Sequence, residues 1–184
     1  MSRCARCRRS RPVVAHALAA GAYDGALRAI VHALKYEGRR SLARPLAALM
    51  RARCAGVFAG ADWLIPVPLH PSRRRARGFN QALDLARRLS AGGPPVCRAL
   101  RRVQATPTQT GLPAAQRHKN VRDAFAARER TPPDVPPLRG TVVVLVDDVS
   151  TTGATLEACA RVLIGMGVRE VRAATAARAV RKPR

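Results

Sequence analysis

The sequence has far fewer acidic residues than basic ones, and it has few aromatic residues. Of its 184 residues, 34 are Lys or Arg and 11 are Asp or Glu, which gives a formal net charge of +23 at pH 7. Aromatic residues make up 3%, so the sequence lacks the aromatic platforms on which single-strand nucleic-acid binders stack bases. A charge this large needs a partner that offsets self-repulsion, and both phosphate-rich small molecules and nucleic acid fit that description.

Long apolar runs are also missing. No stretch approaches the roughly 18 apolar residues of a membrane span, so we expect no span. Basic residues between 3 and 11, followed by the apolar run 13–22, have the outline of a signal peptide, but the run is short and His16 interrupts it. The hydrophobic content of 47% is enough for one domain with a real core. We expect a cytoplasmic protein.

The five cysteines fall into two groups. Cys54, Cys97 and Cys159 stand alone in apolar stretches, where cysteine commonly packs as a small hydrophobic residue. Only Cys4 and Cys7, two residues apart, have metal-ligand spacing. They form half of a tetrahedral zinc site, because no second pair follows to complete four ligands. An odd number of cysteines also favours a reducing compartment.

Strand-like and helix-like patterns alternate along the chain. Apolar residues recur at helical spacing from Asp24 to Gly38, and Thr141 to Val146 is a nearly continuous aliphatic run typical of a strand buried on both faces. This alternation predicts a parallel α/β sheet with its ligand at the carboxyl ends of the strands. The expected helices are 24–38, 41–53, 80–89 and 153–165, the expected strands are 63–68, 96–100, 141–146 and 168–175, and the loops at strand ends are 69–78, 101–122 and 147–155.

The loop 147–155 carries the clearest chemistry. Asp147 and Asp148 follow the buried strand, and a cluster of hydroxyl residues around Gly153 opens the next helix. Free backbone N–H groups at a helix start suit a phosphate, whereas carboxylates suit sugar hydroxyls or a Mg²⁺ that links them to phosphates. A ribose 5′-phosphate satisfies both. The segment lacks the Gly-Lys-Ser/Thr ending of a Walker A loop, and no G-x-G-x-x-G follows a strand.

Residues 143–155 resemble the 5-phosphoribosyl-1-pyrophosphate (PRPP) binding signature of type I phosphoribosyltransferases. Further segments narrow the resemblance to the ComF family of competence-associated, predicted phosphoribosyltransferases: 65–71, 77–81, 106–112 and the residues Arg117, Asn120, Val121, Arg122 and Phe125. The resemblance implies an α/β type I fold, with a central parallel sheet of about five strands flanked by helices and a small hood from residues 12–40 and 170–184.

The resemblance also assigns roles to individual residues. It gives PRPP binding to Asp147, Asp148, Ser150, Thr151, Thr152, Gly153, Ala154, Thr155, Leu69, His70 and Arg73, with Leu69 to Arg73 as the pyrophosphate loop. It gives catalysis to Asp147, Asp148, Arg101 and Arg102, and a mobile lid over 101–122 to Thr106, Gln109 and Arg117.

The implied activity is Mg²⁺-dependent transfer of ribose 5-phosphate from PRPP to an unidentified nitrogen nucleophile with release of pyrophosphate, associated with competence and DNA uptake. The alternative is a non-catalytic PRPP- or nucleotide-sensing regulator that contacts DNA, with the Arg73–Arg77 cluster against the DNA backbone. The partners are then PRPP, an acceptor, and DNA or the competence machinery, and a homodimer is compatible with this assignment.

The resemblance divides the chain in two. Residues 1–11 look like the remnant of an N-terminal zinc ribbon, with Cys4 and Cys7 as its second knuckle, and residues 12–184 form the phosphoribosyltransferase-like domain. Because the first knuckle would precede Met1, either the start is misassigned or the ribbon is lost. We expect Zn²⁺ only if the upstream ribbon is present.

Overall fold

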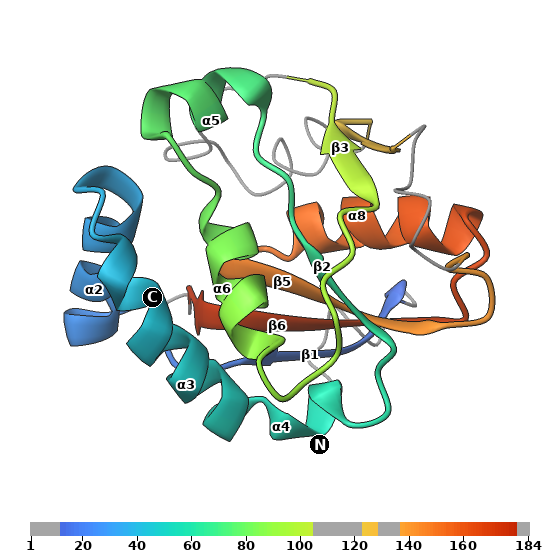
Figure 1. Ribbon diagram of the computed structural model, residues 1–184, viewed down its shortest axis with the longest axis horizontal. Helices are drawn as coiled ribbons and strands as arrows, with labels where there is room; N and C mark the ends of the chain where they lie inside the picture. Colours follow the sequence, from blue (N-terminus) through green and yellow to red (C-terminus); the bar gives the residue numbers. More distant parts are fainter. Residues whose placement is uncertain (1–11, 105–122, 129–136, 180–184) are drawn as a thin grey trace, which may run out of the picture.

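The computed structural model describes residues 12–104, 123–128 and 137–179. A parallel sheet of four strands lies at its centre, in the order β1-β6-β5-β2 (Figure 1). The strands are β1 (Val14–Ala19), β2 (Trp63–Pro66), β5 (Val142–Ser150) and β6 (Glu170–Arg178). The predicted parallel α/β fold is confirmed.

Strand β5 lies between two hydrophobic cores. Val143 and Leu145 enter the core on one face of the sheet, whereas Val144 and Val146 enter the core on the other. Successive side chains of a strand point to opposite faces, so a continuous aliphatic run is needed when both faces are covered. This is why polar residues do not alternate with apolar ones in the run ahead of Asp147.

Helices cover both faces of the sheet. Figure 1 shows α8 on one side, with α3 and α6 on the other. The helix α8 (Ala154–Gly165) contributes Leu156 and Leu163 to the first core. The second core is built from α2 (Gly25–Tyr36), α3 (Ala43–Arg53), the short α4 (Ala55–Phe58) and α6 (Gln81–Leu89), and the 3₁₀ turn η1 (Arg40–Leu42) joins α2 to α3.

The segment expected as a basic loop over 69–78 is largely helical. Helix α5 (Pro71–Arg77) begins after His70, whose side chain accepts a hydrogen bond from the backbone N–H of Ser72. Pro71 occupies the first turn, where its missing N–H costs nothing, and Gly78 ends the helix with φ of 78°. Local capping residues therefore outweigh the repulsion among the arginines of this segment.

The predicted strand 96–100 does not form as expected. Val96 makes a single parallel bridge to Leu64, and the chain then enters a separate antiparallel pair of β3 (Leu100–Arg102) and β4 (Phe125–Ala127). The described sheet therefore has four strands where about five were expected. Pro94 and Pro95 precede Val96 and lack N–H donors, which limits ladder pairing here.

Two further boundaries differ from the expectation. Strand β5 continues through the two aspartates and pairs with β6 as far as Ser150 and Arg178, so Asp147 and Asp148 lie within the strand rather than after it. The expected hood segments also contribute to the sheet, because 14–19 form β1 and 170–178 form β6. Pairing with long neighbouring strands extends β5 beyond its aliphatic run.

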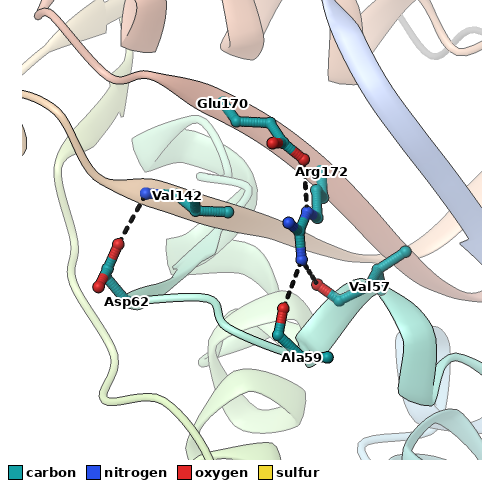
Figure 2. Close-up of polar contacts among 6 residues, drawn as sticks. All are labelled: Val57, Ala59, Asp62, Val142, Glu170 and Arg172. Atoms are coloured by element: carbon teal, nitrogen blue, oxygen red, sulfur yellow. Dashed lines mark hydrogen bonds and ion pairs between the residues drawn. The ribbon is translucent and has the colours of Figure 1, made fainter.

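Polar contacts fasten the amino ends of β5 and β6 to the connection before β2 (Figure 2). The Nε of Arg172 donates to Glu170 at 2.6 Å and its Nη1 donates to the carbonyl of Ala59 at 2.6 Å. The carboxylate of Asp62 accepts a hydrogen bond from the backbone N–H of Val142 at 2.7 Å. Strand β2 is thereby held in register with β5.

Within the described ranges no helix has the length and apolar character of a membrane span. The prediction that Cys54, Cys97 and Cys159 pack as small hydrophobic residues is confirmed, because all three are buried free thiols. Burial raises the pKa of the Cys54 thiol to about 11. These thiols are therefore poor metal ligands and poor nucleophiles at neutral pH.

Candidate functional site

The turn between β5 and α8 forms an open cradle at the carboxyl edge of the sheet. Gly153 precedes α8 with φ of 78°, and a Cβ added there would meet no atom within 4 Å. The backbone conformation, not lack of space, requires glycine at this position. Thr152 helps to shape the turn, since its Oγ1 accepts a hydrogen bond from the N–H of Ala154 at 3.4 Å.

A lysine from α2 reaches the two carboxylates. The Nζ of Lys35 lies 2.7 Å from Oδ1 of Asp148, which is only 6% exposed. Burial of Lys35 opposes its charge, but the carboxylates of Asp148 and then Asp147 outweigh this effect and raise the pKa of Lys35. Lysine and aspartate thus form a partly buried ion pair at the site.

Among the residues of the site, Asp147 has the pKa that departs most from its ordinary value. Burial, followed by repulsion from Asp148, raises its pKa to about 7, although Lys35 and Arg102 oppose the shift. Oδ1 of Asp147 accepts a hydrogen bond from the N–H of Asp148 at 2.8 Å. A carboxyl group that titrates near neutral pH beside a buried ion pair is typical of a functional site.

One of the predicted arginines, Arg102, lies near this carboxyl group. Arg102 stacks over the ring of Phe125 at 5.3 Å from its centroid. Burial lowers the pKa of Arg102, as does repulsion from Arg73, whereas Asp147 acts in the opposite direction. Arg102 on β3 therefore lies within electrostatic range of both Arg73 on α5 and Asp147 on β5.

The other predicted residues occupy varied positions. Arg101 is exposed, and its Nε donates to the carbonyl of Ala127 across the β3–β4 pair at 3.1 Å. His70 caps α5, with its Nδ1 2.7 Å from Oγ of Ser72. Leu69 is partly buried just before this cap. Thr106, Gln109 and Arg117 of the lid, and Cys4 and Cys7, lie outside the described residues.

The turn itself contains the remaining predicted binding residues. Ser150 ends β5, and its carbonyl accepts a hydrogen bond from the N–H of Ala179 at 2.9 Å. Thr151 is exposed, whereas Ala154 is buried and Thr155 partly buried in the first turn of α8. The segment 147–155 therefore presents carboxylates at one end and helix N–H groups at the other.

A cation at this site would need oxygen atoms from its ligand. Among the described residues, no three His, Cys, Asp or Glu side chains are grouped so as to hold a metal ion. Two carboxylates are nevertheless the number with which proteins commonly hold Mg²⁺ when phosphates supply further ligands. The Asp147–Asp148 pair thus fits a Mg²⁺ shared with a phosphorylated substrate.

Lys35 was missed in the sequence analysis, although a signal was present. Val31 and Lys35 are four residues apart in a helix, so they lie on the same face, and Val31 is fully buried. A single lysine on the apolar face of an amphipathic helix needs a carboxylate partner. The helical spacing therefore indicates that Lys35 needs a carboxylate partner, but it does not indicate that this partner is Asp148.

Similarity to known proteins agrees with this site. Residues 76–184 match the family model described as the phosphoribosyl transferase domain. Competence protein F of Haemophilus influenzae is 33% identical over 183 residues, covering 96% of this chain and 78% of that protein. DNA utilization protein YhgH is 33% identical in Salmonella typhi over 175 residues and 32% identical in Escherichia coli K12 over 177 residues, each covering 91% of this chain and 74% of the relative.

The family match includes β5, the turn and α8, which are the elements that form the cradle. The relatives extend the similarity over nearly the whole chain. The chain therefore belongs to the phosphoribosyl transferase domain family, in the group that includes competence protein F and DNA utilization protein YhgH.

Proposed function

We propose that the protein is a Mg²⁺-dependent phosphoribosyltransferase that binds PRPP at residues 147–155 and transfers ribose 5-phosphate to a nitrogen nucleophile. One observation carries the proposal. Two carboxylates at the carboxyl end of β5 precede the turn into the N-terminus of α8, and Arg102, which is itself near Arg73, lies within electrostatic range of Asp147. This arrangement offers complementary groups to each part of PRPP.

The 5′-phosphate would bind at the start of α8. The first N–H groups of this 12-residue helix have no partners within the helix, and the helix dipole favours an anion there. The left-handed Gly153 leaves the approach free of side-chain atoms. The hydroxyls of Thr151 and Thr155 are suitable further donors to phosphate oxygens.

The ribose hydroxyls would donate to the carboxylates of Asp147 and Asp148. Asp148 is paired with Lys35 at 2.7 Å, whereas Asp147 gains its charge only as the pH rises through about 7. Ionised carboxylates accept stronger hydrogen bonds than protonated ones. Binding of PRPP should therefore strengthen between pH 6 and pH 8.

The arginines would act on the leaving group. Breaking the bond from the anomeric carbon to pyrophosphate moves its electron pair to the leaving oxygen. The nucleophile's nitrogen uses its lone pair to form the new bond and releases its proton to the departing pyrophosphate or to solvent. Arg102 places positive charge near Asp147, and Arg73 lies near Arg102, so both could stabilise the negative charge that develops on the leaving group. When bound, Mg²⁺ held by Asp147 and Asp148 would add neutralisation of the pyrophosphate charge.

The names of the relatives favour a second candidate. One relative is named for competence and the other for DNA utilization, and this chain carries a net charge of +23. A regulator that binds PRPP or a nucleotide and contacts DNA would retain the cradle without turnover. Such a protein would bind DNA with steep salt dependence and release no pyrophosphate.

Calorimetric titration of the full chain with Mg·PRPP tests the proposal. Substituting Asp147→Asn together with Asp148→Asn should weaken binding at least about 100-fold, because each lost charged hydrogen bond contributes about 1.5–3 kcal/mol. Asp147→Asn alone, which leaves the Lys35–Asp148 pair intact, should weaken it about tenfold at pH 8. The matched control, Asp123→Asn with Glu37→Gln, removes the same charge at exposed positions and should bind normally.

A screen of nucleobases and amines for pyrophosphate release then separates the two candidates. Release with any acceptor, lost in Asp147→Asn, supports the transferase. Normal PRPP affinity in the folded aspartate variants would refute the ribose assignment. PRPP binding without release, together with salt-sensitive DNA binding, would favour the regulator.

A further inference from the structure

A polar pocket lies beside the sheet, next to the cradle but distinct from the segment 147–155. It has a volume of about 420 Å³ and is bounded by α5, α6 and β3 next to the carboxyl end of β2. No residue of 147–155 lines it. Its apolar wall consists of Pro66, Pro68, Leu69, Pro71, Phe79, Leu83 and Leu100.

Arginines dominate the polar wall of this pocket. A single acidic residue, Asp84, lines it, and Arg40 already neutralises that carboxylate through hydrogen bonds of 2.8 and 3.1 Å. Burial of Asp84, which is 9% exposed, leaves it little capacity to neutralise more. The remaining arginines that line the pocket are Arg74, Arg87, Arg98, Arg101, Arg102 and Arg128.

Four of these arginines form a cluster, which we call the pocket arginines: Arg74 from α5, Arg87 from α6, Arg98 before β3 and Arg128 after β4. Burial lowers the pKa of Arg98, and repulsion from the other three lowers it further. Within residues 12–104, 123–128 and 137–179, no ion pair joins any of the four to a carboxylate. The fold thus brings four positive charges together without an acidic partner in that part of the chain.

We propose that this pocket binds the phosphate chain of a nucleoside di- or triphosphate, at a site separate from the PRPP cradle. Guanidinium groups bind phosphate oxygens through paired hydrogen bonds, and several converging groups match a chain of phosphates better than a single anion. The apolar wall, with Phe79 beneath Arg40, suits the nucleoside. The pocket volume lies in the range typical of small-molecule sites, and an extended nucleic-acid strand needs an open groove instead.

The site goes beyond the proposed transferase activity, and it shares Leu69, Arg101 and Arg102 with the residues assigned to PRPP binding and catalysis. The pocket arginines come from four separate segments, and only the fold brings them together. Arg102 lines this pocket and also lies within electrostatic range of Asp147. A nucleotide in the pocket would therefore be positioned beside the cradle without occupying it.

Equilibrium binding of ATP and of inorganic tripolyphosphate to the full chain tests this site. The charge-reversal variant Arg87→Glu with Arg98→Glu changes two exposed residues of the pocket. Its affinity for both probes should fall at least about 100-fold. The matched control, Arg88→Glu with Arg161→Glu, makes the same charge change at exposed positions outside the pocket and should lose less than about threefold. Melting curves show whether each variant folds, and Arg98→Gln serves as a milder variant.

Each outcome decides the proposal. Selective loss in the pocket variant, with ATP bound normally by Asp147→Asn, supports it. Equal loss in both charge-reversal variants indicates general electrostatic attraction and overturns it, as does no binding by the unmodified chain. Binding that survives in the pocket variant but is lost in Asp147→Asn places the nucleotide in the cradle, and binding of single-stranded oligonucleotide without ATP assigns the arginines to nucleic acid. Failure of PRPP to bind would refute only the proposed function.

Discussion

At the scale of single residues, the environment of Asp147 decides what the site can do. Burial and the neighbouring Asp148 disfavour the charged form of its carboxyl group. Lys35 and Arg102 favour the charged form. The balance keeps Asp147 largely protonated below neutral pH. An incoming ligand that supplies hydroxyl donors or a cation would shift this balance toward the charged form.

The raised pKa of Asp147 predicts how folding stability depends on pH. Because the folded-state pKa of about 7 exceeds the ordinary value of 3.8, the folded protein binds more protons than the unfolded chain between these values. Stability from this group therefore falls as the pH rises from about 4 to about 7. Asp147→Asn should remove the effect, so the variant should gain up to about 4 kcal/mol over the unmodified chain at pH 8 and almost nothing at pH 4.

Urea denaturation of both proteins at several pH values measures this difference. Asp123→Asn, at an exposed aspartate, should give no comparable trend. A stability difference between Asp147→Asn and the unmodified chain that stays constant from pH 4 to pH 8 would contradict the assignment.

At the scale of elements, the connection from α4 to β2 depends on contacts from β6. Arg172 ties the carbonyl of Ala59 and the carboxylate of Glu170 together at the amino end of the sheet (Figure 2). Its hydrogen bond lowers the pKa of Glu170. This end lies opposite the cradle, since all four strands are parallel and the cradle is at their carboxyl ends.

Substituting Arg172→Met should therefore destabilise the fold without altering the cradle. We expect a loss of about 2 kcal/mol, because charged hydrogen bonds contribute about 1.5–3 kcal/mol and the alkyl part of the side chain is retained. Chemical denaturation measures the loss. Arg169→Met, on an exposed arginine of the same region, should change stability by less than about 0.5 kcal/mol. Equal effects of the two substitutions would show that the Arg172 contacts add nothing to the free energy of unfolding.

At the scale of the whole molecule, excess positive charge opposes folding. A formal charge of +23 raises the free energy of the compact state through self-repulsion, and salt screens this repulsion. Raising sodium chloride from about 20 to 200 mM should increase the melting temperature by a few degrees. Scanning calorimetry measures this increase.

The comparison variant is Arg88→Glu with Arg161→Glu, which lowers the net charge at exposed positions. Its melting temperature should respond less to salt than that of the unmodified chain. An identical response would mean that repulsion is not what salt relieves. A falling melting temperature would point instead to ion pairs as the dominant electrostatic contribution.

The sequence by itself predicted the elements whose information is local. The aliphatic run 141–146, the capping residue Asp24 and the cluster around Gly153 specify a buried strand, a helix start and the opening of a second helix from neighbouring residues alone. For the same reason the sequence could place the two aspartates directly before the turn into α8. Helix α5 was the local failure, because its basic composition was given more weight than its capping residues His70 and Gly78.

Only the tertiary structure decided which distant residues meet. Lys35 of α2 reaches Asp148, and Arg102 of β3 approaches Asp147, because the packing of these elements brings them to the carboxyl end of β5. Strand β5 extends past its aliphatic run because β6 pairs with it as far as Ser150. The pocket arginines likewise come together from four segments whose sequences, taken singly, show only exposed basic residues. Hydrophobic periodicity records which face of an element is buried, but contacts between elements depend on the packing of the whole chain, which no local pattern specifies.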